Sequence, residues 1–233
     1  MSQQEQMAQE QQLRDMFSRL APRYNLLNRL MTGGRDRHWR QFAIQKADVP
    51  EGGHLLDLGT GTGDLARETL RQHPHARPVA VDFSLEMMRV GRHKYKKPDG
   101  TWTVAHALHI PFPADTFDAV VSGFLLRNLN DIMASLREQH RVLKPGGTFV
   151  ALETTQRPRT FLSPLIDLYL YKVIPTLGKW IAGKKIAYTY LPTSMDHFLR
   201  AEKLLAYLAA VGFKKLEFQR FMFGTVAVHW GEK

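Results

Sequence analysis

A glycine-rich segment at 55–66, with the sequence LLDLGTGTGDLA, contains the residues of this chain that are best suited to chemistry. Its apolar run carries Asp57 and leads to Gly59, Gly61 and Gly63, after which a helical pattern begins. Exposed backbone N–H groups at such a strand–turn–helix junction can receive a polar, nucleotide-type cofactor. Glycine suits the turn because it adopts positive φ and lets the backbone approach a ligand closely. The segment therefore predicts a cofactor site, and its structural alternative is a plain strand, turn and helix.

The spacing of the glycines favours S-adenosylmethionine (SAM) over NAD. A dinucleotide-binding turn has its third glycine at the position where this chain has Asp64. Further along, the run Val79–Val81 ends in Asp82. A carboxylate at the end of the second strand can accept hydrogen bonds from both ribose hydroxyls of an adenosine, which SAM and NAD both carry. Asp82 therefore does not choose between the two cofactors, and its alternative role is to cap a helix that begins near Ser84.

Strands that alternate with helices must position these residues. The hydrophobic pattern predicts strand 53–58, helix 64–72, strand 78–82, helix 84–94, strand 101–105, strand 117–122, helix 131–141 and strand 147–153. A turn at Lys144–Gly147 separates the last helix from the last strand. Such alternation predicts an α/β fold with a parallel sheet that is covered on both faces.

The N-terminal part is predicted to be helical. Residues 13–46 have the pattern of two amphipathic helices, broken around Pro22 and around 32–34, which would form a helical cap. Residues 1–12 are polar and Gln-rich, so we expect a flexible segment, either a frayed helix or a disordered chain. Residues 13–233 are then expected to form one domain.

The pattern changes after residue 155. Large apolar residues at 161–182 predict a helix that Pro175 should kink, within a helical, substrate-side insertion at 155–200. A helix and two strands are expected beyond it, at 200–210, 213–219 and 222–230. The short connection makes the two strands an antiparallel hairpin at one side of the sheet.

Composition limits the classes of protein that fit. The chain has 233 residues, with 32 Lys and Arg against 22 Asp and Glu, for a net charge of +10. That excess suits an acidic ligand, an anionic membrane surface or nucleic acid, but no RNA-binding signature accompanies it. Cysteine is absent, which excludes disulfides and is compatible with a reducing cytoplasm. There is neither a secretion signal nor an apolar run of membrane-spanning length in the sequence.

Together these features resemble the class I SAM-dependent methyltransferases. The motifs that carry this resemblance are 55–66, Asp82, Pro111-Phe112-Pro113 with Phe117-Asp118, Leu126-Arg127-Asn128 and Arg141–Gly147. Three more stretches are similar to the ubiquinone/menaquinone biosynthesis C-methyltransferases, namely FSRLAPRYNLLN at 17–28, AYTYLPTS at 187–194 and GTVAVHWG at 224–231. The resemblance covers about residues 15–231.

The resemblance implies a Rossmann-like class I methyltransferase fold. That fold has a seven-stranded, mostly parallel sheet with a C-terminal antiparallel hairpin, helices on both faces and an N-terminal helical cap. The implied reaction transfers a methyl group from SAM, leaving S-adenosylhomocysteine, to a ring carbon of a prenylated quinol. The implied substrate is demethylmenaquinol, or its benzoquinol analogue, in respiratory quinone biosynthesis.

The resemblance also assigns cofactor residues, because the family positions that match Thr62, Asp82, His106 and Ala107 contact SAM. This chain differs from the family at two positions, with His106 in place of the usual Asp or Asn and Gly123 in place of serine. The expected cofactor-binding residues are Asp57, Gly59, Gly61, Thr62, Asp82, His106, Ala107 and Gly123.

Methyl transfer to carbon depends on the nucleophile. A quinol carbon attacks well when its neighbouring hydroxyl is ionised, which needs a base or a cation that lowers the phenol pKa. Arg127 follows the strand that ends at Ser122, so it should lie at the carboxyl edge of the sheet, where open α/β sheets bind ligands. We expect Arg127 to stabilise the phenolate or orient a water, Asn128 to hold the second oxygen and Tyr24 to close over the site. The structural alternatives are a salt bridge for Arg127 and simple packing for Tyr24.

Partners other than the cofactor follow from the same sequence. The apolar helix at 161–182, with Lys172, Lys179, Lys184 and Lys185, could receive a prenyl tail and meet anionic head groups. We therefore expect a cytoplasmic protein, peripheral at the inner face of a membrane, although a core helix or a homodimer contact fits the same pattern. Metal binding is not expected, since the histidine pairs at 73 and 75 and at 106 and 109 lack a third ligand.

Three other functions stay open. One is methyl transfer to another small aromatic or lipid substrate. Another is a nucleotide-dependent oxidoreductase, against which the position of the third glycine argues. The last is a SAM-binding or nucleic-acid-binding protein without catalysis. The Asn/Asp-Pro-Pro-aromatic motif of many base methyltransferases is absent, which argues against nucleic acid as a substrate.

Overall fold

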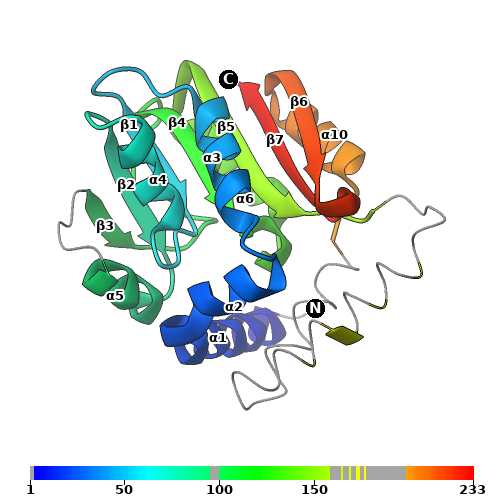
Figure 1. Cartoon of the computed structure of the whole chain (residues 1–233). Coiled ribbons are helices and arrows are strands. Elements are labelled where there is room, and N and C mark those ends of the chain that lie inside the picture. Colours follow the sequence, from blue (N-terminus) through cyan, green and yellow to red (C-terminus); the bar gives the residue numbers. More distant parts are fainter. Residues whose placement is uncertain are drawn as a thin grey trace.

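A seven-stranded sheet with helices on both faces forms the centre of the computed structural model (Figure 1). The structure describes residues 3–94, 100–157 and 198–233, together with residues 164, 168, 172, 173 and 176. Its elements in chain order are α1 (Gln3–Leu20), η1 (Ala21–Arg23), α2 (Tyr24–Met31), α3 (Asp36–Ala47), β1 (His54–Leu58), α4 (Asp64–Gln72), β2 (Arg77–Asp82), α5 (Leu85–Lys94), β3 (Thr101–Val104), β4 (Phe117–Gly123), η2 (Leu126–Asn128), α6 (Ile132–Val142), β5 (Leu143–Thr154), α10 (Ala201–Val211), β6 (Lys214–Phe221), η4 (Met222–Gly224) and β7 (Val226–Glu232).

The strand order in the sheet is β3-β2-β1-β4-β5-β7-β6. Strands β1 to β5 are parallel, while β7 runs antiparallel between β5 and β6. The predicted mostly parallel sheet and its C-terminal antiparallel hairpin are confirmed. The order reverses between β1 and β4, and open α/β sheets bind their ligands at the carboxyl edge beside such a point.

Apolar side chains fill both sides of the sheet. On one side Trp39 and Ile44 of α3 and Leu65 of α4 pack against Leu55 and Val121 of the strands. On the other side, residues of α6 and α10 pack against the opposite face of the same strands, with Leu136, Leu204, Leu56, Val120 and Phe149 at the centre of the cluster. The period-two alternation of β1 and β4 thus supplies both cores, because successive side chains point to opposite faces.

Strand register brings the chemically interesting residues to one edge. Leu58 of β1 lies opposite Val81 of β2 and Ser122 of β4. The next residues of the three strands, Gly59, Asp82 and Gly123, therefore reach the carboxyl edge at the same level. Helices α1 and α2 lie beneath this edge (Figure 1).

The N-terminal cap contains more helices than the sequence predicts. Breaks occur at both expected places, the 3₁₀ turn η1 around Pro22 and the turn that contains Gly33 and Gly34. They divide the segment into α1, α2 and α3, where two helices were expected. Helix α1 begins at Gln3, so the polar segment expected to be either frayed helix or disordered contributes to it.

Strand β5 begins at Leu143, earlier than the predicted residue 147. Phe117 of β4 lies opposite Leu143, but Ala119 lies opposite Thr148, so the intervening residues of β5 bulge out of register. Gly146 lies in this bulge with a φ of +75°. The expected turn at 144–147 is thus an irregularity inside the strand, because Leu143 already pairs with β4.

The predicted helix at 161–182, its kink at Pro175 and the stretch 187–194 lie outside the described residues, except for the few positions named above. They stay predictions.

Candidate active site

The glycine turn after β1 has the backbone conformation that its sequence predicts. Gly59, Gly61 and Gly63 have φ values of +69°, +56° and +77°, in the left-handed region that favours glycine. The N–H groups of Gly59 and Thr60 donate to the carbonyl of Val81, at 2.8 and 3.0 Å, which ties the turn to β2. A Cβ atom at Gly59 would lie 2.8 Å from a methyl carbon of Leu125, so the turn is also closely packed against the loop after β4.

Asp82 connects this turn to the start of α5. One carboxylate oxygen accepts the N–H of Gly61 at 2.7 Å, and the other accepts the N–H of Ser84 at 2.8 Å. Burial raises the pKa of Asp82, although these backbone donors act in the opposite direction. Each carboxylate oxygen can accept a further hydrogen bond. Asp82 therefore orders the turn, as the capping alternative suggests, and also has acceptor capacity for a ligand.

Asp82 and the glycine turn line a cleft at the carboxyl edge with about 730 Å³ of space, part of it open to solvent. Eight predicted site residues line it, namely Tyr24, Gly59, Gly61, Asp82, His106, Ala107, Gly123 and Asn128. The rest of the lining is apolar apart from backbone, and comprises Leu13, Phe17, Leu58, Phe83, Met87, Ala105, Phe124, Leu125 and Leu129. The cleft thus has a polar end at Asp82 and aromatic and aliphatic surfaces around it.

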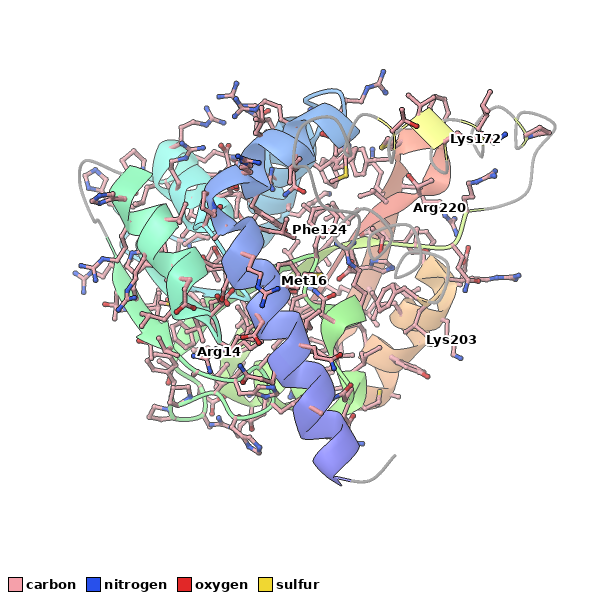
Figure 2. All side chains as sticks on the ribbon, turned by 90° about the horizontal axis from the view of Figure 1, so that it is seen from below. Arg14, Met16, Phe124, Lys172, Lys203 and Arg220 are labelled. Carbon is pink, nitrogen blue, oxygen red and sulfur yellow. The ribbon has the colours of Figure 1, made fainter. Side chains whose placement is uncertain are left out.

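Helix α1 covers this cleft. Seen from below, α1 crosses in front of the carboxyl edge of the sheet, with Phe124 beside it (Figure 2). Ser18 of α1 donates to the carboxylate of Glu86 at 3.0 Å and lies 3.3 Å from the hydroxyl of Ser84, so α1 is joined to the start of α5. Phe17 and Tyr24 pack edge to face at 6.2 Å between ring centroids. Tyr24 therefore lines the cleft from a cap that is bound to the body of the fold. That it closes over a substrate stays a prediction.

The loop after β4 supplies another side of the cleft. Phe124 has a φ of +57°, and its N–H donates to the carbonyl of Leu152 at 2.8 Å. The side-chain amide of Asn128 donates to the carbonyl of Phe124 at 2.9 Å. Gly123 has little room for a side chain, since a Cβ atom there would lie 3.0 Å from Leu65. A serine at this position would need a small movement of Leu65.

Two predicted cofactor residues lie behind the cleft instead of lining it. The Asp57 carboxylate accepts the hydroxyl of Thr60 at 2.6 Å and the N–H of Ala66 at 3.0 Å, so it orders the turn from beneath. Burial raises the pKa of Asp57 to about 7, and the second carboxylate oxygen has no hydrogen-bond partner. The hydroxyl of Thr62 donates to the side-chain oxygen of Asn25 at 2.8 Å, so the Thr62 side chain points toward α2.

Arg127 also lies outside the lining of the cleft. Its guanidinium forms a buried ion pair with Glu153, at 3.4 Å between Nη1 and Oε1, and donates to the hydroxyl of Thr154 at 3.2 Å. The side chains of Arg127 and Glu153 are 6% and 1% exposed. The backbone N–H of Arg127 donates to the same carboxylate, and the guanidinium lies 5.0 Å from the ring centroid of Phe124. The structure therefore places Arg127 as the salt-bridge alternative describes, although its Nε is buried without a hydrogen-bond partner.

Glu153 and Asn25 are the functional candidates that sequence reasoning missed. Glu153 carries a weak signal, because an acid that directly follows the apolar residues 149–152 within a strand is unusual unless it is paired. Burial raises its pKa, and the Arg127 cation opposes that shift. Asn25 carries no such signal. It binds Thr62 and donates to Asp64 at 3.2 Å, so it joins α2 to the start of α4.

A metal site finds no support in the described part of the chain, which contains no group of three or more His, Asp or Glu that could hold an ion. The His106 and His109 rings lie 6.4 Å apart, and Nδ1 of His106 accepts the N–H of Leu108 at 3.2 Å. Among the same residues, no helix is both long and apolar enough to cross a membrane.

Comparisons with known proteins identify the family of this chain. The model of the ubiE/COQ5 methyltransferase family matches residues 5–233. The ubiquinone/menaquinone biosynthesis C-methyltransferase UbiE of Desulfotalea psychrophila is 41% identical over 94% of this chain and 89% of that protein. The demethylmenaquinone methyltransferase of Thermus thermophilus is 40% identical over 94% of this chain and its own full length.

Solved structures show the fold at lower identity. The [4+2]-cyclase SpnF has a TM-score of 0.69 at 18% identity, covering 96% of this chain and 95% of that one. Human N-acetylserotonin methyltransferase, solved in complex with SAM, has a TM-score of 0.61 at 16% identity, covering 91% and 55%. One fold therefore carries different reactions, and the site must decide among them.

Proposed function

The chain belongs to the ubiE/COQ5 methyltransferase family and is a SAM-dependent C-methyltransferase, and from that premise we propose that its acceptor is the ring of a prenylated quinol. The first candidate is demethylmenaquinol, and the benzoquinol analogue is the second. The observation that supports this acceptor most is the identity of about 40% with demethylmenaquinone methyltransferase and UbiE proteins over nearly the whole chain. Conversion of demethylmenaquinol to menaquinol is a step of respiratory quinone biosynthesis.

The residues at the polar end of the cleft fit SAM. Asp82 would accept the ribose hydroxyls, and the turn at Gly59 and Gly61 has no side chains that would block an approaching ligand. His106 and Ala107 line the cleft beside Asp82 and would contact the adenine. When bound, SAM supplies an electrophilic methyl group on a sulfonium, with a neutral leaving group.

The protein must make the acceptor carbon nucleophilic. Ionisation of the neighbouring quinol hydroxyl does this, and a nearby cation lowers the pKa of that hydroxyl. Arg127 is the candidate cation, because its guanidinium lies 5.0 Å from the ring centroid of Phe124, which lines the cleft, so its charge would act on the hydroxyl from behind that lining. Asn128 would hold the second ring oxygen from the side of the cleft.

The cap would exclude water from the reaction. Phe17 and Tyr24 line the cleft from α1 and α2, and Phe83 and Phe124 line it as well, so an aromatic ring would be enclosed by other aromatic rings. This lining supports a planar, largely apolar acceptor better than a highly polar one. Tyr24 would close over the bound quinol.

A substrate with a prenyl tail would reach the protein from a membrane surface. The substrate is lipid-soluble, and the chain carries a net charge of +10, which favours contact with anionic head groups. We propose a cytoplasmic, peripheral location on this basis. A homodimer stays a proposal that sedimentation of the purified chain would test.

The test is methyl transfer to defined acceptors. Purified protein is incubated with SAM labelled in its methyl group and with demethylmenaquinol or demethylated benzoquinol, each kept reduced. We expect one labelled methyl on a ring carbon, located by mass fragmentation, and no transfer to the oxidised quinone, which is a poor nucleophile. Transfer to oxygen, or no transfer to either reduced ring by protein that binds SAM, would contradict the proposal.

A further inference from the structure

A second cleft lies outside the catalytic one, among α2, α3 and α4, which neighbour one another in Figure 1. It has about 1100 Å³ of space, part of it open to solvent, and every residue that lines it is polar or charged. Five arginines line it, namely Arg29, Arg37, Arg40, Arg67 and Arg71. We call it the arginine cleft. Nothing in the proposed methyl transfer uses it.

The charges of this cleft do not cancel. Three acids line it beside the five arginines, which leaves two positive charges. Arg40 is almost buried and is paired with both Asp36 and Asp64. Arg71 forms an ion pair with Glu68 at 2.5 Å. Arg67 also pairs with Asp64, at 3.7 Å. Three arginines therefore offset the three acids, and two arginines remain.

Arg29 and Arg37 carry the excess. Both side chains are exposed, and neither forms an ion pair or a side-chain hydrogen bond with any residue that the structure describes. They approach the cleft from different helices, α2 and α3. Arginines that converge from separate elements are well suited to phosphate, because each guanidinium can donate two parallel hydrogen bonds to its oxygens.

Helix α2 connects this cleft to the catalytic one. Tyr24 lines the catalytic cleft, whereas Asn25 and Arg29 line the arginine cleft. Leu26, between them, is 53% exposed, which makes it one of the most exposed large apolar residues in the described chain. An exposed leucine beside exposed arginines on a short amphipathic helix is the pattern of a segment that lies at a lipid–water interface.

We propose that the arginine cleft binds the phosphate of an anionic phospholipid head group, with Leu26 entering the acyl boundary beside it. The choice of a lipid over a soluble phosphate rests on the proposed function, since a prenylated acceptor resides in the bilayer. Binding there would hold α2, and with it Tyr24 and the carboxyl edge, against the surface from which the acceptor comes.

Vesicle co-sedimentation tests this surface. The full chain is mixed with vesicles of phosphatidylcholine alone or of phosphatidylcholine with phosphatidylglycerol, at one fixed ionic strength. We expect binding to the mixed vesicles only. The double variant Arg29→Gln/Arg37→Gln should reduce the partition coefficient about 20- to 30-fold, as expected for two arginines at an anionic surface. Leu26→Ser should weaken binding by several-fold.

The matched control removes the same charge elsewhere. Arg77 and Lys214 begin β2 and β6 at the amino edge of the parallel strands, away from α2, and both are exposed. Arg77→Gln/Lys214→Gln should change vesicle binding by about twofold at most, because those charges would face away from the membrane. An equal loss in this control would mean general electrostatic attraction and would overturn the proposal.

Further outcomes would also overturn it. One is binding to mixed vesicles that is unchanged in the Arg29 and Arg37 variant. Another is a rise in the melting temperature with inorganic phosphate that the double variant loses, while vesicles have no effect on wild type. That result would assign the cleft to a soluble anion. A third is loss of RNA binding in the double variant without loss of vesicle binding.

The outcome is separable from the proposed function. Methyl transfer to a short-chain, water-soluble quinol should be the same in wild type and in the Arg29 and Arg37 variant, with an unchanged melting temperature. Failure of wild type to methylate both that quinol and demethylmenaquinol would reject the proposed function even if vesicle binding were as expected. Normal methylation without vesicle binding would reject the arginine cleft alone.

Discussion

Asp57 shows which property of a residue in the glycine turn its sequence specifies and which it does not. It lies at the carboxyl end of β1 as expected, but its side chain faces Thr60 and Ala66 beneath the turn. The periodicity of the strand identifies a buried acid. It does not tell whether that acid faces a ligand or the backbone of the turn, because that depends on the path of residues that follow.

The raised pKa of Asp57 predicts a pH-dependent stability. Burial raises the pKa from 3.8 to about 7, so the folded protein holds a proton that the unfolded chain loses. The contribution of Asp57 to the unfolding free energy should therefore fall as pH rises from about 4 to about 7, by about 4 kcal/mol. His229, whose pKa burial lowers to about 4, contributes in the opposite direction over part of this range. Asp57→Asn should remove this contribution, because the amide oxygen still accepts from Thr60 and Ala66 without ionising. The quantity to compare is therefore the difference in unfolding free energy between the variant and wild type at each pH. Urea unfolding at several pH values measures it.

The control for this measurement is Asp118→Asn. Lys144 and the backbone N–H of His54 hold the pKa of Asp118 below its usual range against the effect of burial. Its contribution is present above the unfolded pKa and is lost only as pH falls below about 4. The control should therefore leave the slope between pH 4 and 7 intact. A variant of Asp57 that keeps the wild-type slope would show that another group titrates there.

Among contacts between elements, the ion pair of Arg127 in η2 with Glu153 in β5 bears most directly on the catalytic cleft. Glu153 accepts both the guanidinium and the backbone N–H of Arg127, so it fixes the turn whose Asn128 lines the cleft. A buried pair of this kind has two interpretations. Arg127 could orient the turn only, or it could also act on the acceptor.

A double-mutant cycle separates the two interpretations. Arg127→Met or Glu153→Gln alone leaves one buried charge unpaired and should cost about 3–5 kcal/mol of unfolding free energy. Together they remove both charges, and Gln can still accept the N–H of Thr154, so most of that stability should return. We predict that kcat does not return, because the cation behind the cleft lining would be missing, while SAM affinity stays near wild type. If the double variant recovered kcat together with stability, Arg127 would have a structural role only.

The sequence predicted most elements because local signals specify them. The alternation of strand and helix, the glycine turn and the antiparallel hairpin all follow from neighbouring residues. The bulge in β5 was missed because it depends on how Leu143 pairs with β4, which no local pattern encodes. The same limit applies to Arg127 with Glu153 and to Asn25 with Asp64, since partners 26 and 39 residues apart meet only when the sheet and cap assemble.

At the scale of the whole molecule, the sheet and the cap have separate tasks. The sheet brings Gly59, Asp82 and Gly123 to one edge through its register, and this half of the site could be predicted from sequence. The cap brings Phe17 and Tyr24 over the same edge, and only the structure shows which residues hold it there. The resulting cleft has one end suited to an adenosine and a surface suited to an aromatic acceptor.

A crystal structure of the chain with S-adenosylhomocysteine would show whether the cleft at the carboxyl edge binds the cofactor. We predict density for the adenosine in the cleft at the carboxyl edge, with the ribose hydroxyls within hydrogen-bond distance of the Asp82 carboxylate and the chain passing close to Gly59 and Gly61. Density at another place on the protein, or a cleft that stays filled by side chains of α1 at saturating ligand, would contradict it.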